Sequence, residues 1–191
     1  MRCLLCENLS LTHICSHCQT TFLKPSRYKR QLENGIEVFS FYKYNDIKEL
    51  LHTKHTDLGF YIYKILAINS LKLFAESFEF TQKLASLCID DTIKSGYSHT
   101  AILNATLKSR VIKPYYSKLR ARNPISYSGK DRAFRLNNPR DFQFKNFKEK
   151  ELILVDDIIT TGSTLTQAIK LLQKQNKEVL FCLTLCDVAN R

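Results

Sequence analysis

The chain has 191 residues, of which 44% are hydrophobic, and its formal net charge is +11. A chain of this length can bury a core without disulfide staples, and its apolar content excludes wholesale disorder. Its seven cysteines are an odd number, and no export signal is recognisable, which argues against a disulfide framework and predicts a reducing, cytoplasmic location. The most apolar window, 60–74, is interrupted by Lys64, Asn69 and Lys72, so no membrane-spanning segment is expected.

The first 22 residues are polar and rich in cysteine. Two C-x2-C pairs, eight residues apart, comprise Cys3, Cys6, Cys15 and Cys18. Four thiolates at this spacing can surround one tetrahedral Zn²⁺, so we expect a structural zinc site. His13 and His17 are alternative ligands, and a redox C-x-x-C is a weaker alternative. The remaining cysteines lie in apolar runs and are expected in the core: Cys88, Cys182 and Cys186.

A basic linker over 23–35 carries Lys24, Arg27, Lys29 and Arg30 and ends in an Asn34-Gly35 turn. Composition then predicts a strand over 36–44 and a helix capped by Asn45 or Asp46. Gly59 should interrupt the helical pattern, which resumes over 60–75. A first core strand is expected within 80–89, a helix over 98–108 after Gly96, and a short strand at 111–112.

Residues 108–150 contain thirteen Lys and Arg against three acids, which is nearly the whole net charge. We expect a long loop with a weak hairpin here, because hydrophobic residues are sparse. Aromatic residues interleaved with cations are typical of single-stranded DNA binding. The alternatives are a solvated loop or a lid over pyrophosphate formed by six cations: Lys118, Arg120, Arg122, Lys130, Arg132 and Arg135.

The C-terminal part predicts a βαβ unit. An apolar strand over 152–155 precedes a helix over 163–174 and a second buried strand over 179–185. Asp156 and Asp157 follow the first strand, at the edge of a parallel sheet where ligands bind.

The loop between this strand and helix has the chemistry of a ribose 5-phosphate site. Carboxylates accept two hydrogen bonds from vicinal hydroxyls, and a helix N-terminus attracts an anion. Gly162 allows close approach of backbone to phosphate. The hydroxyls of the loop add donors: Thr160, Thr161, Ser163 and Thr164. A plain helix cap at Ser163 or Thr164 would explain only one or two of these residues.

This run resembles the phosphoribosyl pyrophosphate (PRPP) motif of type I phosphoribosyltransferases. The resemblance implies an α/β fold with a mostly parallel sheet, flanking helices and a separate hood. It also implies Mg²⁺ carried by PRPP, with Asp156 and Asp157 at the ribose and residues 160–164 at the 5-phosphate.

The four-cysteine module joined to this loop resembles the ComF/ComFC competence-protein family. The place of that family's proline-rich pyrophosphate loop reads Asp90-Asp91 and then Gly96-Tyr97, so the resemblance extends to PRPP binding and not to turnover. It implies single-stranded DNA as partner during natural transformation, with a competence helicase and other DNA-uptake factors. It also places the protein in the cytoplasm or at the inner face of the membrane.

We therefore expect a zinc finger over 1–22, a linker over 23–35 and a phosphoribosyltransferase-like domain over 36–191, with hood elements over about 36–80 and the core over about 81–191. The expected function is handling of single-stranded DNA, with PRPP–Mg²⁺ as ligand or regulator. An active phosphoribosyltransferase of nucleotide salvage and a zinc-ribbon factor without PRPP function are the alternatives. The DNA-contacting candidates are Lys24, Arg27, Lys29, Arg30, Lys118, Arg120 and Arg122.

Overall fold

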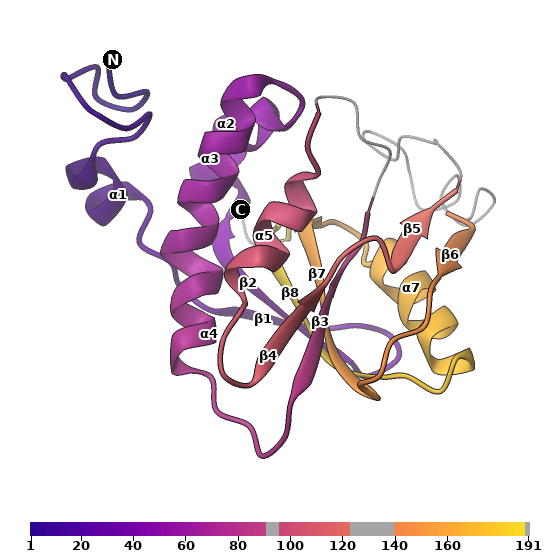
Figure 1. Cartoon of the computed structure of the whole chain (residues 1–191). Coiled ribbons are helices and arrows are strands. Elements are labelled where there is room, and N and C mark those ends of the chain that lie inside the picture. Colours follow the sequence, from indigo (N-terminus) through magenta and orange to yellow (C-terminus); the bar gives the residue numbers. More distant parts are fainter. Residues whose placement is uncertain (91–95, 123–139, 190–191) are drawn as a thin grey trace.

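The computed structural model describes residues 1–90, 96–122 and 140–189. Within them, a six-stranded sheet has the order β1-β2-β8-β7-β3-β4 (Figure 1). All neighbouring pairs in this sheet are parallel except β1 with β2. The expected α/β fold with a mostly parallel sheet is confirmed.

The sheet strands are β1 (Tyr28–Gln31), β2 (Glu37–Lys43), β3 (Leu84–Cys88), β4 (Ile112–Tyr115), β7 (Glu151–Ile159) and β8 (Glu178–Asp187). A separate antiparallel pair comprises β5 (Leu119–Ala121) and β6 (Phe142–Phe144). The helices are α1 (Ser16–Phe22), α2 (Tyr44–Leu51), η1 (His52–His55), α3 (Asp57–Ala67), η2 (Ile68–Lys72), α4 (Leu73–Ser77), α5 (His99–Thr106) and α7 (Ser163–Lys174).

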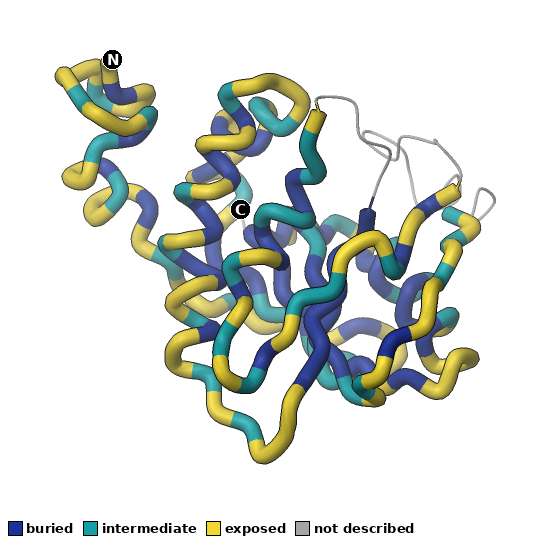
Figure 2. The backbone as a smooth tube through the Cα atoms, viewed as in Figure 1, coloured by how far each residue is buried: buried dark blue, intermediate teal, exposed yellow. Residues whose placement is uncertain are grey.

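Helices cover both faces of the sheet. Because side chains alternate along a strand, Ile153 and Val155 of β7 pack in the cluster that contains α2 to α5. Leu152 and Leu154 pack on the opposite face, with α7 and Phe147. Figure 2 shows the strands as a buried layer between more exposed helices. This explains why β7 is apolar at every position from 152 to 155.

The segment expected to be a basic linker contains the edge strand β1. It pairs with β2 in a hairpin closed by Gly35, whose φ of 84° is left-handed as expected for this turn. Residues expected to form hood elements supply β2, which pairs with β8, and helices on the sheet face. These parts are therefore built into the central layers.

Helices α3, η2 and α4 follow one another without a break from 57 to 77. Gly59 lies inside the first turn of α3 and does not interrupt it. A Cβ there would come within 2.2 Å of the Thr53 carbonyl oxygen and the Tyr97 hydroxyl, so glycine is required for close packing. Among the described residues, this 21-residue stretch, with a mean hydropathy of 1.3, is the one helix long and apolar enough to cross a membrane. Since 44% of its apolar 18-residue window is buried and Tyr63, Leu66 and Leu71 pack in the core, it also has the character of a core helix.

Several local expectations are corrected. Helix α2 begins after Lys43 with no side-chain cap, so neither Asn45 nor Asp46 caps it. Strand β7 continues to Ile159, which places both acids within the strand and not after it. The expected hairpin in the basic middle is present as β5 and β6. Asp91 and three lid candidates lie outside the described residues: Lys130, Arg132 and Arg135.

Candidate functional site

The four N-terminal cysteines converge as predicted. Their sulfur atoms all lie within 4.8 Å of one another, and those of Cys6 and Cys15 are 3.7 Å apart. Tetrahedral zinc with Zn–S bonds of about 2.3 Å separates its sulfurs by roughly 3.8 Å. The geometry of the donor set therefore fits one zinc ion. His13 packs its ring against Tyr61 instead, with centroids 4.7 Å apart.

Backbone amides around this cluster favour thiolates. The N–H of Cys15 donates to Cys3 Sγ over 3.3 Å, and that of Cys18 donates to Cys15 Sγ over 3.4 Å. Burial by itself raises the pKa of Cys3, but backbone hydrogen bonds from Cys15, Leu5 and Cys6 lower it to about 6. Burial beside the other three sulfurs raises the pKa of Cys18. A bound cation would remove this conflict by stabilising all four thiolates.

The module contacts α3 and η2, and its polar contacts tie it to the main domain. Asn69 donates to the side-chain oxygen of Gln19 over 3.0 Å, and the buried Tyr42 hydroxyl donates to the carbonyl of Leu23 over 3.3 Å. Cys3, Ile14 and Cys18 belong to the same apolar cluster as the helices on that face of the sheet. The cysteine module is therefore packed against the domain and not tethered by a free linker.

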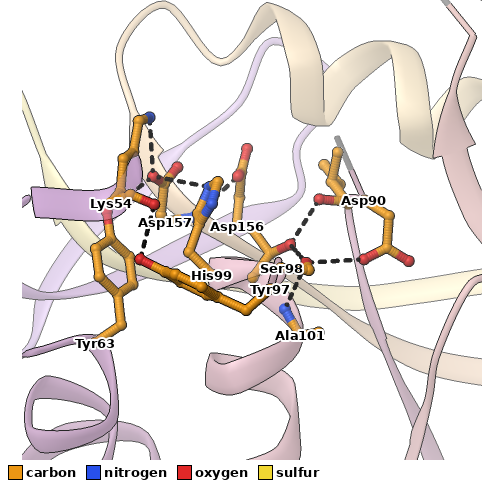
Figure 3. A network of polar contacts seen from close by, with 11 residues as sticks. Lys54, Tyr63, Asp90, Tyr97, Ser98, His99, Ala101, Asp156 and Asp157 are labelled. Atoms are coloured by element: carbon orange, nitrogen blue, oxygen red, sulfur yellow. Dashed lines mark hydrogen bonds and ion pairs between the residues drawn. The ribbon is translucent and has the colours of Figure 1, made fainter. Parts of the chain in front are cut away.

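At the end of β7, the two acids have different environments. Asp157 is buried, and its Oδ2 atom accepts from Tyr63 over 3.3 Å and lies 3.4 Å from both Lys54 Nζ and His99 Nε2 (Figure 3). Asp156 is half-buried, and its Oδ1 accepts from the N–H of Asp157 over 2.9 Å. The partners of Asp157 come from η1, α3 and α5, so this carboxylate joins three elements to the strand end.

Neighbouring charges keep Asp157 ionised. Burial would raise its pKa. The charges of Lys54 and His99, together with side-chain hydrogen bonds involving Lys54 and Asp156, instead lower it to about 2. A buried carboxylate persists in its charged form only when it is paired in this way. Asp157 is thus a fixed negative charge beneath the strand ends.

The loop from Thr160 to Thr164 turns the chain from β7 into α7. Gly162 has a φ of 79° and stands at the N-cap without a side-chain cap hydrogen bond, so neither Ser163 nor Thr164 is the cap. A Cβ at Gly162 would meet Leu32 at 2.6 Å. Glycine is required here for two independent reasons, its left-handed backbone and its contact with the β1–β2 hairpin.

Hydroxyl groups of the loop are held in local hydrogen bonds. Thr161 Oγ1 accepts from the N–H of Ser163 over 3.3 Å, and Ser163 Oγ accepts from Gln167 over 3.1 Å. Gln167 in turn accepts from the N–H of Arg140 over 3.0 Å. These hydroxyls lie beside the first-turn amides of α7, and a helix N-terminus of this kind favours an anion.

Asp90 organises the neighbouring strand end, β3. Its Oδ1 accepts from Ser98 over 3.2 Å and from Cys88 over 3.3 Å, and its Oδ2 accepts from the N–H of Ser117 over 3.0 Å. Burial raises the pKa of this carboxyl above its ordinary value, against the lowering effect of its donors. Asp90 therefore ties the start of α5 to the segment between β4 and β5.

The DNA-contacting candidates are distributed over two places. Lys24, Arg27 and Lys29 are exposed near β1, whereas Arg120 and Arg122 are exposed at β5. Lys29 pairs with Glu37 at 2.5 Å, and Lys118 donates to the carbonyl of Asn146 over 3.1 Å. Arg30 points inward: it donates to the carbonyl of Thr160 over 2.7 Å and lies 3.1 Å from Asp187 Oδ1.

Sequence reasoning missed Lys54, Tyr63 and His99 as parts of the site. They lie on three elements that the sequence separates by long intervals, and no motif marks them. Only His99 carried a usable signal, because a helix beginning soon after Gly96 places it at the carboxyl ends of parallel strands. The inward role of Arg30 was likewise hidden within a run of basic residues.

Residues 120–191, which include the loop, match the family model of the phosphoribosyl transferase domain. The transcriptional regulator GfcR of Methanosphaera stadtmanae is 28% identical over 92 residues, which cover 48% of this chain and 43% of that protein. The chain thus spans less than half the length of this curated relative.

Among solved structures, the orotate phosphoribosyltransferase of Aeropyrum pernix is similar at 20% identity, covering 90% of this chain and 80% of that one, with a TM-score of 0.40. The Mycobacterium tuberculosis H37Rv orotate phosphoribosyltransferase in complex with inorganic phosphate is similar at 11% identity, covering 88% and 90%, with a TM-score of 0.37. At such scores the likeness says nothing about substrate. The family match and the sheet together describe a phosphoribosyltransferase-type domain.

Proposed function

We propose that the chain binds PRPP, with its Mg²⁺, at the carboxyl ends of β7 and β3. One observation supports this proposal. The half-buried carboxylate of Asp156, the left-handed Gly162 and the N-terminus of α7 follow one another along one strand–loop–helix turn. A ribose diol is matched by the carboxylate, and its 5-phosphate by the first amides of the helix.

The two acids are assigned different roles within this site. Asp156 is the main acceptor for the ribose hydroxyls, because Oδ2 of Asp157 is already engaged by Lys54, Tyr63 and His99. Asp157 holds the strand end and keeps it negative. The 5-phosphate is assigned to Thr160, Thr161, Gly162, Ser163 and Thr164.

The carboxylate of Asp156 is a hard oxygen donor that suits Mg²⁺. When bound with PRPP, the ion supplies positive charge that neutralises the pyrophosphate. The chain's own contribution is to orient the ribose and to present amides to the 5-phosphate.

Calorimetric titration of PRPP–Mg²⁺ tests this proposal. Wild-type protein should bind, and Asp156→Asn should bind at least about 10-fold more weakly, since a charge-assisted hydrogen bond is removed. Asp46→Asn, an exposed acid in α2, is the matched control and should bind as wild type. Wild-type protein without measurable PRPP binding would refute the assignment.

We also propose that the protein handles single-stranded DNA, as expected of a competence protein in natural transformation. The net charge of +11 and the exposed cations at β1 and β5 support this. Because β1 belongs to the six-stranded sheet and β5 to the separate two-stranded sheet, the two basic sites are separate candidates. Because Arg30 pairs with Asp187, we leave it out of the DNA-binding surface. The exposed candidates are then Lys24, Arg27 and Lys29 at one site and Arg120 and Arg122 at the other.

Binding of labelled single-stranded DNA at several salt concentrations tests this second part. Replacing Lys24, Arg27 and Lys29 by Ala should weaken binding and reduce the slope of log affinity against log salt by about 0.7 for each phosphate that the variant no longer neutralises. The pair Arg120→Ala and Arg122→Ala tests the other surface. Affinity that is independent of salt in the wild type would argue against DNA as a partner, and with it against a competence helicase as a neighbour.

Transfer of the ribose to an acceptor is the second candidate function, favoured by the match to the phosphoribosyl transferase family model over 120–191. Incubation with PRPP and a panel of purines, pyrimidines and orotate, followed by assay of released pyrophosphate, distinguishes binding from turnover. Pyrophosphate release that requires both an acceptor and Asp156 would show that this protein is an enzyme.

A further inference from the structure

The β1–β2 hairpin contacts the phosphate loop through two residues. Nη1 of Arg30 donates to the carbonyl of Thr160 over 2.7 Å, although the two residues are 130 positions apart in the chain. The same nitrogen lies 3.1 Å from Oδ1 of Asp187, which is 1% exposed. Leu32, two residues after Arg30, occupies the space that a side chain at position 162 would need.

The alternation of β1 explains why these two residues act together. Arg30 and Leu32 have the same parity and are directed to the loop side, whereas Lys29 and Gln31 are exposed. Leu32 is buried in the cluster that contains Ile159 and Leu165, one at each end of the loop. The hairpin therefore supports the loop at its first residue and at its glycine.

The hydrogen bond from Arg30 restricts the backbone at the start of the loop. A carbonyl oxygen held at 2.7 Å by a guanidinium is not available to turn toward a bound phosphate, where its lone pairs would repel the anion. A bond from a charged donor is also stronger than one between neutral groups. Asp187 holds the guanidinium in place, and Asp187 is itself fixed by the N–H of Ala189, which donates to Oδ1 over 2.8 Å.

We propose that the β1–β2 hairpin holds the phosphate loop in its anion-binding conformation, with Arg30 as the positioning residue. This inference rests on the proposed binding of a ribose 5-phosphate group by that loop. It gives Arg30 a role distinct from that of its exposed neighbours in the basic segment: Arg30 acts on the sugar phosphate through Thr160, and Lys29 does not.

The test compares full-length Arg30→Met with Lys29→Met, a change on the opposite face of the same strand. Ribose 5-phosphate is the probe, measured by calorimetry, and amide hydrogen exchange is followed at 160–164 without ligand. Arg30→Met should bind about 10-fold more weakly and exchange faster at the loop. Lys29→Met should match the wild type in both measurements, and Arg30→Lys, which keeps the charge against Asp187, should recover part of the affinity.

A second variant guards against loss of folding. Arg30→Met leaves the carboxylate of Asp187 without its cation, so Arg30→Met/Asp187→Asn, which removes both charges of the pair, is measured as well. It should also show faster exchange at 160–164, with exchange in α3 unchanged. A merely structural role would instead raise exchange throughout the domain or nowhere.

The outcomes separate the two proposals. Wild-type protein that does not bind ribose 5-phosphate overturns the proposed function of the loop, and the inference with it. Wild-type binding together with equal affinity and unchanged loop exchange in Arg30→Met and in Arg30→Met/Asp187→Asn overturns the positioning role alone.

Discussion

His99 Nε2 lies 3.4 Å from Oδ2 of Asp157, which joins the first residue of α5 to the end of β7. The same oxygen is approached by Lys54 and Tyr63, so a single carboxylate fixes three surrounding elements around the strand end. Its neighbour Asp156 is half-buried, and its Oδ1 accepts from the N–H of Asp157. Two acids adjacent in sequence therefore differ in their environment: Asp157 is buried among charged partners, and Asp156 is half-buried.

Replacement of Asp157 by Asn should lower the free energy of unfolding by about 3 kcal/mol, because Lys54 loses its buried counter-charge. Asp156→Asn should change stability little and lower PRPP affinity. Urea unfolding followed by circular dichroism measures the first effect, and calorimetry the second. Equal stability of the two variants would contradict the division of roles.

Lowering the pH should remove the contribution that Asp157 makes to the free energy of unfolding. Its pKa is lowered to about 2 in the folded protein from an ordinary value of 3.8, so its stabilising effect is present above about pH 4 and lost as the pH falls toward 2. The stability difference between wild type and Asp157→Asn should therefore shrink by roughly 2 kcal/mol over that interval. The groups that face this carboxylate are Lys54, His99, Tyr63 and Asp156. Urea unfolding of both proteins at a series of acidic pH values is the measurement; a constant difference would contradict the low pKa.

Loss of one cysteine should release the metal. Native mass spectrometry should find one zinc in the wild type and none in Cys6→Ser, because three thiolates cannot complete the tetrahedral set. His17→Ala, in the exposed first turn of α1, is the control and should retain its zinc. Retention of zinc by Cys6→Ser, or a wild type without metal, would be inconsistent with the four-cysteine site.

Two glycines with similar backbone angles form a matched pair. Gly35 has a φ of 84° with no atom within 4 Å of an added Cβ, whereas Gly162 has a φ of 79° with Leu32 at 2.6 Å. Gly35→Ala should cost only the left-handed strain, about 1 kcal/mol. Gly162→Ala should cost about 3 kcal/mol, since overpacking is added to the strain. Thermal unfolding and PRPP titration check both variants, and PRPP affinity should fall only for Gly162→Ala.

Local features were predictable because their signals are contiguous. The strand, the acidic pair, the Gly-containing loop and the start of helix α7 follow one another along one short run of the chain. The four-cysteine cluster was predictable for the same reason, since two C-x2-C pairs separated by a short stretch of chain can readily converge. The end points were less accurate, because β7 extends through Asp156 and Asp157. The alternative of a side-chain cap at Ser163 or Thr164 is wrong, since Gly162 stands at the N-cap.

Only the tertiary structure decided what surrounds the loop. The sequence by itself determined a strand–loop–helix unit carrying two acids and a cysteine module, because each is a short run whose local structure does not depend on distant residues. It did not reveal that β2 would lie beside β8 and thereby bring Arg30 and Leu32 to the loop, nor that η1, α3 and α5 would close on Asp157. Those contacts join residues far apart along the chain, and their existence depends on the order of strands in the sheet, which local propensity and periodicity do not encode.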